Sequence, residues 1–271
     1  MIQFLLNDQL VTEERIDPNL TVLSYLRTHQ RRCGTKEGCA SGDCGACSVT
    51  LGSVVDGRLH YQTVNSCLML VSGLQGRQLI TVEDLREGKT LHPAQQAMVD
   101  CHGSQCGFCT PGFVMSLFSL QKNHSGWDRQ QAEHALAGNL CRCTGYRSIM
   151  AAAEQLVTRA QSDSFDRCEQ GVVERLRALE NQEVRVIQDK GRHCYLPTTV
   201  AQLAALCVAH PDAALLAGGT DLSLLITQRY QGIPVMIALG QVDALKHCYE
   251  DDASYHLGAA ASLDQIAAFM A

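Results

Sequence analysis

The chain has 271 residues, of which 46% are hydrophobic, a content that predicts two domains or three small ones, each able to bury a core. Its formal net charge of −6 argues against a nucleic-acid partner, because neutralising phosphates requires clustered Lys and Arg. The N-terminal residues lack the basic and apolar regions of a secretory signal, and no uncharged stretch is long enough to span a bilayer, so we expect a cytosolic protein with no membrane partner.

Residues 1–82 predict mostly strands. Residues 2–6 and 10–16 would form a hairpin around Asn7-Asp8-Gln9, and Thr21 would begin a short helix. Further short strands are expected at 48–51, 59–64 and 78–82.

The first cysteine group lies among these strands. Cys39, Cys44 and Cys47 have the spacing C-x4-C-x2-C and are followed by Cys67, which is the plant-type ferredoxin spacing for a [2Fe-2S] centre. Four glycines interleave with the first three cysteines and let backbone amides turn toward the sulfurs of an anionic cluster. The alternatives are a zinc site or buried thiols, but zinc motifs usually pair two C-x2-C knuckles, so the four-residue gap favours iron and sulfur.

Helical periodicity begins near His92 and continues to about residue 161. Helices are expected at 93–99, 112–122, 128–137 and 146–160, which would form a small four-helix domain. Thr110-Pro111 resembles a helix N-cap followed by proline, and Thr144-Gly145 would begin the last helix. Each neighbouring cysteine pair would then lie at the positive end of a helix dipole.

The second cysteine group comprises Cys106, Cys109, Cys141 and Cys143. Its spacing alone is ambiguous, because Cys101, Cys106 and Cys109 also read C-x4-C-x2-C. Zinc held by the four cysteines of the group competes with an iron-sulfur cluster at this stage. In a cytosolic protein thiols stay reduced, so the fourteen cysteines predict metal ligands and buried thiols rather than disulfides.

The C-terminal part predicts an α/β unit after a charged linker. The linker would span residues 162–187 and contain one exposed helix at 169–180. After the linker, helices would alternate with strands; the helices are expected at 200–209, 222–228 and 263–269, and the strands at 213–217, 234–239 and 255–258. The turn Gly218-Gly219-Thr220-Asp221 could cradle a diphosphate, although an ordinary strand-to-helix turn is the alternative. The unit stops abruptly at Ala271, so we expect it to be unfinished.

Long motifs in this sequence resemble one protein family. The segments are GTKEGC at 34–39, GDCGAC at 42–47, QCGFCTPG at 105–112, GNLCRCTGY at 138–146 and LLAGGTDL at 215–222. They resemble the xanthine dehydrogenase family of molybdenum hydroxylases, and their order is similar to that of its small bacterial iron-sulfur and flavin subunit. The resemblance covers nearly the whole chain and also includes LGAA at 257–260.

The resemblance implies an α+β multidomain fold with four parts. These are a β-grasp, plant-type ferredoxin-like [2Fe-2S] domain at 1–86, a four-helix [2Fe-2S] domain at 87–161, a linker at 162–187 and the first part of an α/β FAD-binding domain of the PCMH type at 188–271. It implies two [2Fe-2S] clusters, one held by Cys39, Cys44, Cys47 and Cys67 and the other by Cys106, Cys109, Cys141 and Cys143. Cys101 matches no ligand, and His92 and His102 are expected to be packing or supporting residues.

The same resemblance assigns FAD contacts and partners. The FAD-binding segment would be Leu215, Leu216, Ala217, Gly218, Gly219, Thr220, Asp221 and Leu222. In the family the flavin domain continues with a second glycine-rich segment, so we expect this FAD site to be incomplete unless another chain completes it. A molybdopterin-binding large subunit would carry the substrate chemistry, for which no catalytic residue is assigned here, and NAD would be the terminal electron acceptor.

The predicted function is therefore that of the electron-transfer subunit of a xanthine dehydrogenase-like oxidoreductase of purine metabolism, inactive without its partner chains. One alternative is the iron-sulfur subunit of a carbon monoxide or aldehyde dehydrogenase relative. Another, of a different class, is a non-enzymatic interaction module stabilised by zinc.

Overall fold

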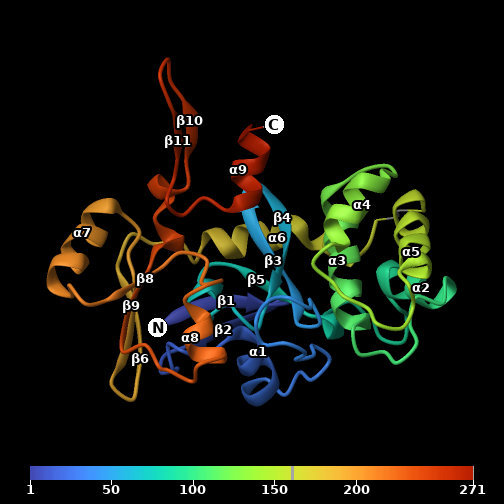
Figure 1. The fold of residues 1–271 in the computed structure, drawn as a ribbon, viewed down its shortest axis with the longest axis horizontal. Helices are drawn as coiled ribbons and strands as arrows, with labels where there is room; N and C mark the ends of the chain where they lie inside the picture. Colours follow the sequence, from blue (N-terminus) through green and yellow to red (C-terminus); the bar gives the residue numbers. More distant parts are fainter. Residues whose placement is uncertain (160–161, 271) are drawn as a thin grey trace.

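The computed structural model describes residues 1–159 and 162–270 and contains three units along the chain (Figure 1). In the first unit, a five-stranded sheet has the order β2-β1-β5-β3-β4. Its strands are β1 (Ile2–Leu6), β2 (Gln9–Glu13), β3 (Ser48–Val55), β4 (Arg58–Asn65) and β5 (Gln78–Ile80). Strands β1 and β5 are parallel, whereas the β1–β2, β3–β4 and β3–β5 pairs are antiparallel.

The predicted hairpin and first helix are present. Asn7 adopts a left-handed φ of 54° in the tight turn between β1 and β2, a conformation that asparagine tolerates better than most residues. The Thr21 hydroxyl accepts from Ser24 N and caps α1 (Val22–Ser24), which continues as a π-helical turn over Tyr25–His29. Two short 3₁₀ turns, Val71–Leu74 and Val82–Asp84, flank β5.

The second unit is a helical domain. Its helices are α2 (Pro93–Asp100), α3 (Thr110–Asn123), α4 (Arg129–Leu136) and α5 (Arg147–Thr158). Helix α3 is the centre of this domain, since every residue from Gly112 to Leu120 is buried. Two starts differ from the prediction: Cys109 rather than Thr110 is the N-cap residue of α3, and α5 begins at Arg147 after a left-handed Tyr146.

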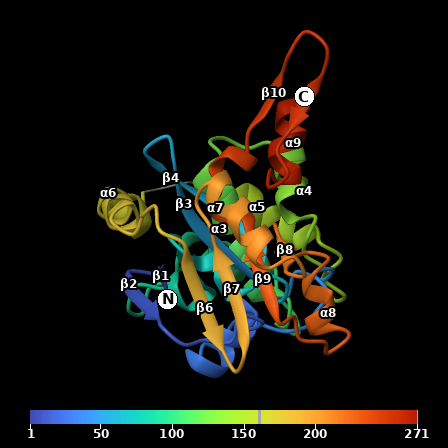
Figure 2. The same ribbon diagram turned by 90° about the vertical axis from the view of Figure 1, so that its left-hand side faces the viewer.

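Helix α6 (Ser164–Arg177) follows the helical domain and packs against the outer side of the first sheet (Figure 2). We expected an exposed helix at 169–180, but α6 begins earlier because Asp163 caps it through Phe165 N and Asp166 N. Its apolar stripe of Val172, Leu176 and the following Leu179 is buried against Leu5 of β1. The segment after the helical domain is therefore part of the packed structure.

The third unit contains a four-stranded sheet of order β6-β7-β9-β8 and a separate hairpin. The sheet strands are β6 (Arg185–Asp189), β7 (Arg192–Leu196), β8 (Ala214–Leu216) and β9 (Val235–Ala238), and the hairpin strands are β10 (Cys248–Glu250) and β11 (Tyr255–Leu257). Helices are α7 (Val200–Ala209), α8 (Ser223–Thr227) and α9 (Leu263–Met270), with 3₁₀ turns at Leu239–Gln241 and Asp243–Leu245. We predicted neither β6–β7 nor β10; the β6–β7 turn uses left-handed Lys190 and Gly191.

The first and third units share one hydrophobic core. Buried Phe4 and Leu79 of the first sheet belong to the same cluster as Ile187, Cys194 and Met236 of the second sheet. The Asn19 side chain, 6% exposed, pairs with the backbone of Ile233 in both directions, at 2.9 Å to the carbonyl and 2.6 Å from the amide. The amino group of Met1 also donates to Val186 O, which fixes the start of β1 against β6.

Candidate iron-sulfur and flavin sites

The first cysteine group forms two thiol pairs. Cys39, Cys44 and Cys47 lie in the loop before β3, and Cys67 follows β4. The Cys39 thiol contacts that of Cys44, and the Cys47 thiol contacts that of Cys67. Cys47 and Cys67 are 1% and 2% exposed and pack with Leu23 and Leu68. Two pairs of thiols are what a [2Fe-2S] cluster needs, since four cysteines hold its two irons.

Backbone amides of the loop point at the Cys39 sulfur. Ser41 N lies 3.4 Å and Asp43 N lies 3.3 Å from Cys39 Sγ. Burial raises the pKa of the Cys39 thiol, but hydrogen bonds from Ser41 and Cys44 outweigh it and lower this pKa to about 6. The loop therefore favours a thiolate, which is the form that binds metal.

Each of the two pairs contains one thiol that ionises more readily than its partner. The hydrogen bond from Cys67 lowers the pKa of Cys47 to about 7. The pKa of Cys67 is raised in turn by that hydrogen bond and by burial, and burial raises the pKa of Cys44. The thiol with the lower pKa in each pair is the one that more readily supplies the thiolate that a metal binds.

Glycine is required in the loop because side chains would enter the space around the sulfurs. A Cβ on Gly38 would lie 2.7 Å from Cys44 Sγ. Gly45 has a left-handed φ of 67°, and a Cβ there would lie 2.2 Å from Gly138 O. The missing side chain of Gly38 leaves space around the sulfur of Cys44. The missing side chain of Gly45 allows the loop to touch the segment that carries Cys141 and Cys143.

The second cysteine group also forms two thiol pairs, Cys106 with Cys143 and Cys109 with Cys141. Thr144 donates to Cys141 Sγ from its amide at 3.4 Å and from its hydroxyl at 3.1 Å. Burial raises the pKa of Cys141, but these hydrogen bonds lower it below its ordinary value. Burial raises the pKa of its partner Cys109 to about 12.

The two cysteine groups are joined through the backbone. Leu140 N, directly before Cys141, donates to Cys44 O at 2.9 Å. The buried Asn139 amide donates to Gly45 O at 2.9 Å and to Ser48 Oγ at 3.1 Å, and its oxygen accepts from Ser116 Oγ at 2.6 Å. We did not predict a role for Asn139, because its partners lie up to 94 residues away in the chain.

Cys101 lies outside both groups of pairs. It ends α2, and its thiol donates to Gln155 Oε1 of α5 at 3.6 Å. Within residues 1–159 and 162–270 there is no group of three or more His, Cys, Asp or Glu side chains placed to hold a single metal ion. The thiols instead meet two at a time.

His92 is a structural residue of the helical domain rather than a neighbour of the cysteines. It is 4% exposed, its Nδ1 accepts from Ala94 N, and its Nε2 lies 2.8 Å from Asp163 Oδ2. Lys122 Nζ lies 2.6 Å from Asp163 Oδ1 and 2.7 Å from Asp166 Oδ1. These contacts hold the pKa of Asp163 well below its usual range despite burial.

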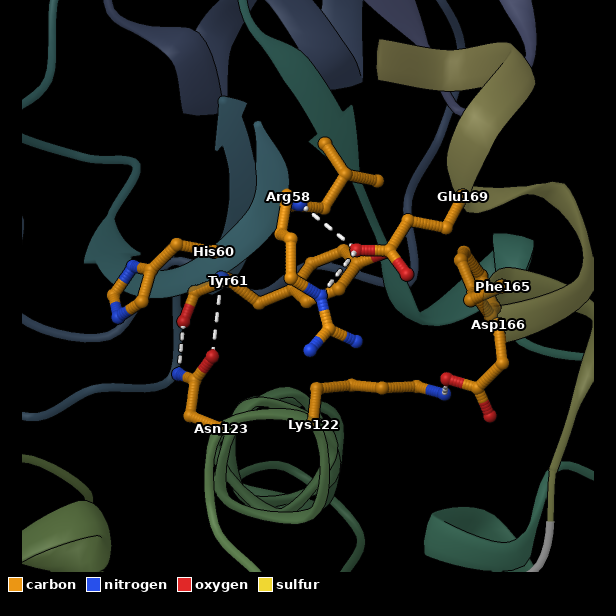
Figure 3. A pocket seen from close by; sticks show the side chains of 9 residues that line it. Arg58, His60, Tyr61, Lys122, Asn123, Phe165, Asp166 and Glu169 are labelled. Atoms are coloured by element: carbon orange, nitrogen blue, oxygen red, sulfur yellow. Dashed lines mark hydrogen bonds and ion pairs between the residues drawn. The ribbon is translucent and has the colours of Figure 1, made fainter. Parts of the chain in front are cut away.

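Lys122 and Asp166 also line a cavity of about 250 Å³ between β4, α3 and α6 (Figure 3). On the other side of this cavity Asn123 pairs with the backbone of Tyr61, and Glu169 accepts from Leu59 N at 3.0 Å. The charged side chains of Lys122, Asp166 and Glu169 that line this cavity are paired with other side chains or with the backbone. No cysteine lines the cavity.

The glycine turn of the third unit lies where a strand ends. Leu215 and Leu216 belong to β8, Gly219 is left-handed with φ 82°, and Gly218 has open space around its missing side chain. Helix α8 has only five residues, so helix-dipole stabilisation of a phosphate is weaker than we expected. Leu222 precedes this helix, and Ala217, Thr220 and Asp221 are exposed beside the turn.

The residues around this turn fit a polar ligand such as a flavin nucleotide. Ser223 is fully buried, and a Cβ on Gly219 would lie 3.0 Å from its Oγ. Among the described residues, Ser223 Oγ and Thr227 Oγ1 are buried atoms that have no hydrogen-bond partner. Buried hydroxyls in native proteins normally have a partner, so these two atoms are available to a ligand.

Comparison with known proteins identifies three domain families along the chain. Residues 4–72 match a 2Fe-2S iron-sulfur cluster binding domain, and residues 81–154 match a [2Fe-2S] binding domain. Residues 186–271 match the FAD binding domain in molybdopterin dehydrogenase. These matches confirm the predicted fold class and the predicted cofactors, two [2Fe-2S] clusters and FAD.

Relatives cover the chain from end to end. It is 33% identical over 310 residues to xanthine dehydrogenase of Drosophila subobscura and 32% identical over 307 residues to aldehyde oxidase 2 of Mus musculus, covering 100% and 98% of this chain. Each match spans 23% of the relative. The structure of aldehyde oxidoreductase from Desulfovibrio gigas superimposes with a TM-score of 0.52 at 32% identity, over 58% of this chain and 17% of that one.

In the part of the chain that the structure describes, no helix is both long and apolar enough to cross a membrane.

Proposed function

Because this chain belongs to the molybdenum hydroxylase family that includes xanthine dehydrogenase and aldehyde oxidase, we propose that it is the electron-transfer subunit of such an enzyme. When bound, its two [2Fe-2S] clusters and FAD would supply the redox centres that connect a molybdopterin-bearing partner with NAD. The observation that carries this proposal is the presence of two groups of paired thiols joined by a backbone hydrogen bond.

We assign the ligands by these pairs. Cys39 and Cys44 would share one iron of the first cluster, and Cys47 and Cys67 the other. In the second cluster the pairs would be Cys106 with Cys143 and Cys109 with Cys141. Cys101 is left out because its thiol faces Gln155.

The contacts between the proposed cofactor sites support an electron relay. The hydrogen bond between Leu140 N and Cys44 O connects the two ligand loops. At the same site, a Cβ on Gly219 would lie 3.5 Å from the carbonyl of Leu68, the residue after Cys67. The first cysteine group therefore contacts both the segment that carries Cys141 and the proposed FAD segment, Leu215 to Leu222, as a relay through this site would require.

The molybdopterin partner would approach the second site. Cys106 and Cys143 are exposed, and Phe108 and Leu140 beside them are 48% and 54% exposed. Exposed apolar side chains around a redox site are typical of a protein interface. We further propose a substrate of the xanthine class, oxidised in the cytosol as part of purine metabolism; an aldehyde is the alternative, since aldehyde oxidase 2 of Mus musculus is 32% identical.

The test is electron paramagnetic resonance of the anaerobically purified, dithionite-reduced protein, together with metal analysis. We expect two distinct S = 1/2 signals and about four irons per chain, because each cluster contains two irons. Zinc in place of iron, with neither signal, would contradict the proposal. Co-purification of a molybdenum-bearing chain from the native host would then identify the partner.

A further inference from the structure

Helix α8 of the third unit lies against the first cysteine loop (Figure 1). Leu224 packs on the cluster formed by Cys47, Cys67 and Leu68. Gln228 is the C-cap residue of α8, four positions after Leu224, so it lies near the same side of the helix. Its Nε2 donates to Cys39 O at 3.1 Å and to Ala40 O at 2.9 Å.

The two carbonyls that Gln228 holds flank a strained residue. Ala40 has a left-handed φ of 53°, which costs energy for a residue with a Cβ. Such a conformation persists only where the surrounding structure enforces it. The side-chain amide of Gln228, which bridges the carbonyls of Cys39 and Ala40, is a contact of that kind. Gln228 lies 189 positions after Cys39 and 188 positions after Ala40 in the chain.

The left-handed turn at Ala40 has a direct consequence for the sulfur of Cys39. It reverses the chain so that the next amides, Ser41 N and Asp43 N, reach back to Cys39 Sγ at 3.4 Å and 3.3 Å. Amide hydrogen bonds to ligand sulfurs stabilise the more negative, reduced state of a cluster and raise its reduction potential.

We propose that Gln228 is a positioning residue for the first cluster site, which sets the reduction potential of that cluster by holding Ala40 in its left-handed conformation. The inference rests on the proposed function, because it requires the first thiol group to carry a [2Fe-2S] cluster. It makes the flavin-binding unit part of the redox environment of the iron-sulfur unit, beyond its role in binding FAD.

The experiment is a potentiometric titration of the full-length Gln228→Met protein, followed by electron paramagnetic resonance. Methionine keeps the length of the side chain but cannot donate a hydrogen bond. We expect the midpoint potential of the first cluster to fall, with a change of up to about tenfold in the ratio of oxidised to reduced cluster, or 59 mV for one electron. The second cluster is the internal reference and should keep its potential.

Two further variants separate positioning from a general loss of structure. Gln202→Met removes a side-chain amide that donates to Gln182 O at 2.7 Å in the same unit, and it should leave both potentials unchanged. Ala40→Gly, added to Gln228→Met, should restore the potential of the first cluster, because glycine adopts left-handed φ values freely.

The outcomes distinguish the inference from the proposed function. An unchanged first potential in Gln228→Met, an equal shift of both potentials, or a shift that Ala40→Gly does not reduce would each overturn the inference. The absence of both signals in the unsubstituted protein would instead overturn the proposed function. A fall confined to the first cluster and reversed by Ala40→Gly supports the inference.

Discussion

At the first cysteine site two of the four thiols, Cys47 and Cys67, are 1% and 2% exposed, whereas at the second site Cys106 and Cys143 are exposed to solvent. The first loop is enclosed by its own sheet, by the helical domain through Asn139 and by α8 through Gln228. The second site is built at the N-terminus of α3 and in the turn before α5. The comparison indicates that the first site is the insulated centre of the chain and the second is the one a partner can reach.

The largest expected effect comes from removing one ligand at the insulated site. Cys44→Ser should abolish the first cluster completely and leave the second, because a neutral hydroxyl does not replace a thiolate on iron. The loss of one of two paramagnetic signals is the measurement. Cys101→Ser is the matched control and should retain both signals; loss of a cluster there would show that Cys101 is a ligand.

The contact between the two sites can be broken at Gly45. Gly45→Ala places a Cβ 2.2 Å from Gly138 O in a left-handed residue and should lower the free energy of unfolding by about 3 kcal/mol, from overpacking and strain together. Gly76→Ala has a similar φ of 68° with nothing within 4 Å, so about 1 kcal/mol is expected. Urea unfolding measures both, and equal losses would exclude a role for the contact.

The ion pairs of Lys122 connect the helical domain with the start of α6. Substitutions at these pairs test how much this connection contributes to the free energy of unfolding. Asp163→Asn should lower the free energy of unfolding by about 3 kcal/mol at pH 7, because it leaves Lys122 with the half-exposed Asp166 alone. Asp166→Asn should cost less than about 1 kcal/mol, as expected of a more exposed carboxylate. Urea unfolding of the two variants makes the comparison.

The contribution of Asp163 should also depend on pH. Its folded pKa is depressed, so the stabilisation is fully present above the unfolded value of about 4 and is lost as pH falls toward the folded pKa. The difference between the wild type and Asp163→Asn should therefore shrink between about pH 5 and pH 2. A difference in the free energy of unfolding that stays constant over this range would show that Asp163 is not ionised in the folded protein.

The smallest effect concerns access to the irons. A chelator is added to the oxidised protein, and samples are reduced with dithionite at intervals. The second paramagnetic signal should be lost several times faster than the first, because Cys106 and Cys143 are exposed. Equal rates would show that the loop around the first site opens as readily as the second site does. Leu224→Ala should then bring the two rates closer, since Leu224 packs on Cys47 and Cys67.

Local patterns predicted the elements better than the contacts between them. The span of α7 was predicted without error, and the spacing of the cysteines indicated both groups, because each depends on neighbouring residues. Asn139, Gln228 and the pair formed by Asn19 and Ile233 were not predicted, since each has a partner that lies at least 94 residues away. Strand β7 was missed because His193 and Tyr195 interrupt its apolar pattern, although Cys194 and Leu196 are buried.

The core shared by the first and third units determines the order in which the chain can mature during translation. Ile187, Met236 and Ala238 belong to the core that contains Ile2 and Phe4, so this core can close only after residue 238 has left the ribosome. The core of the helical domain is complete by Phe165. The second cysteine group and its helical core are therefore synthesised before the core beside the first group can close, and the two clusters can be inserted in that order.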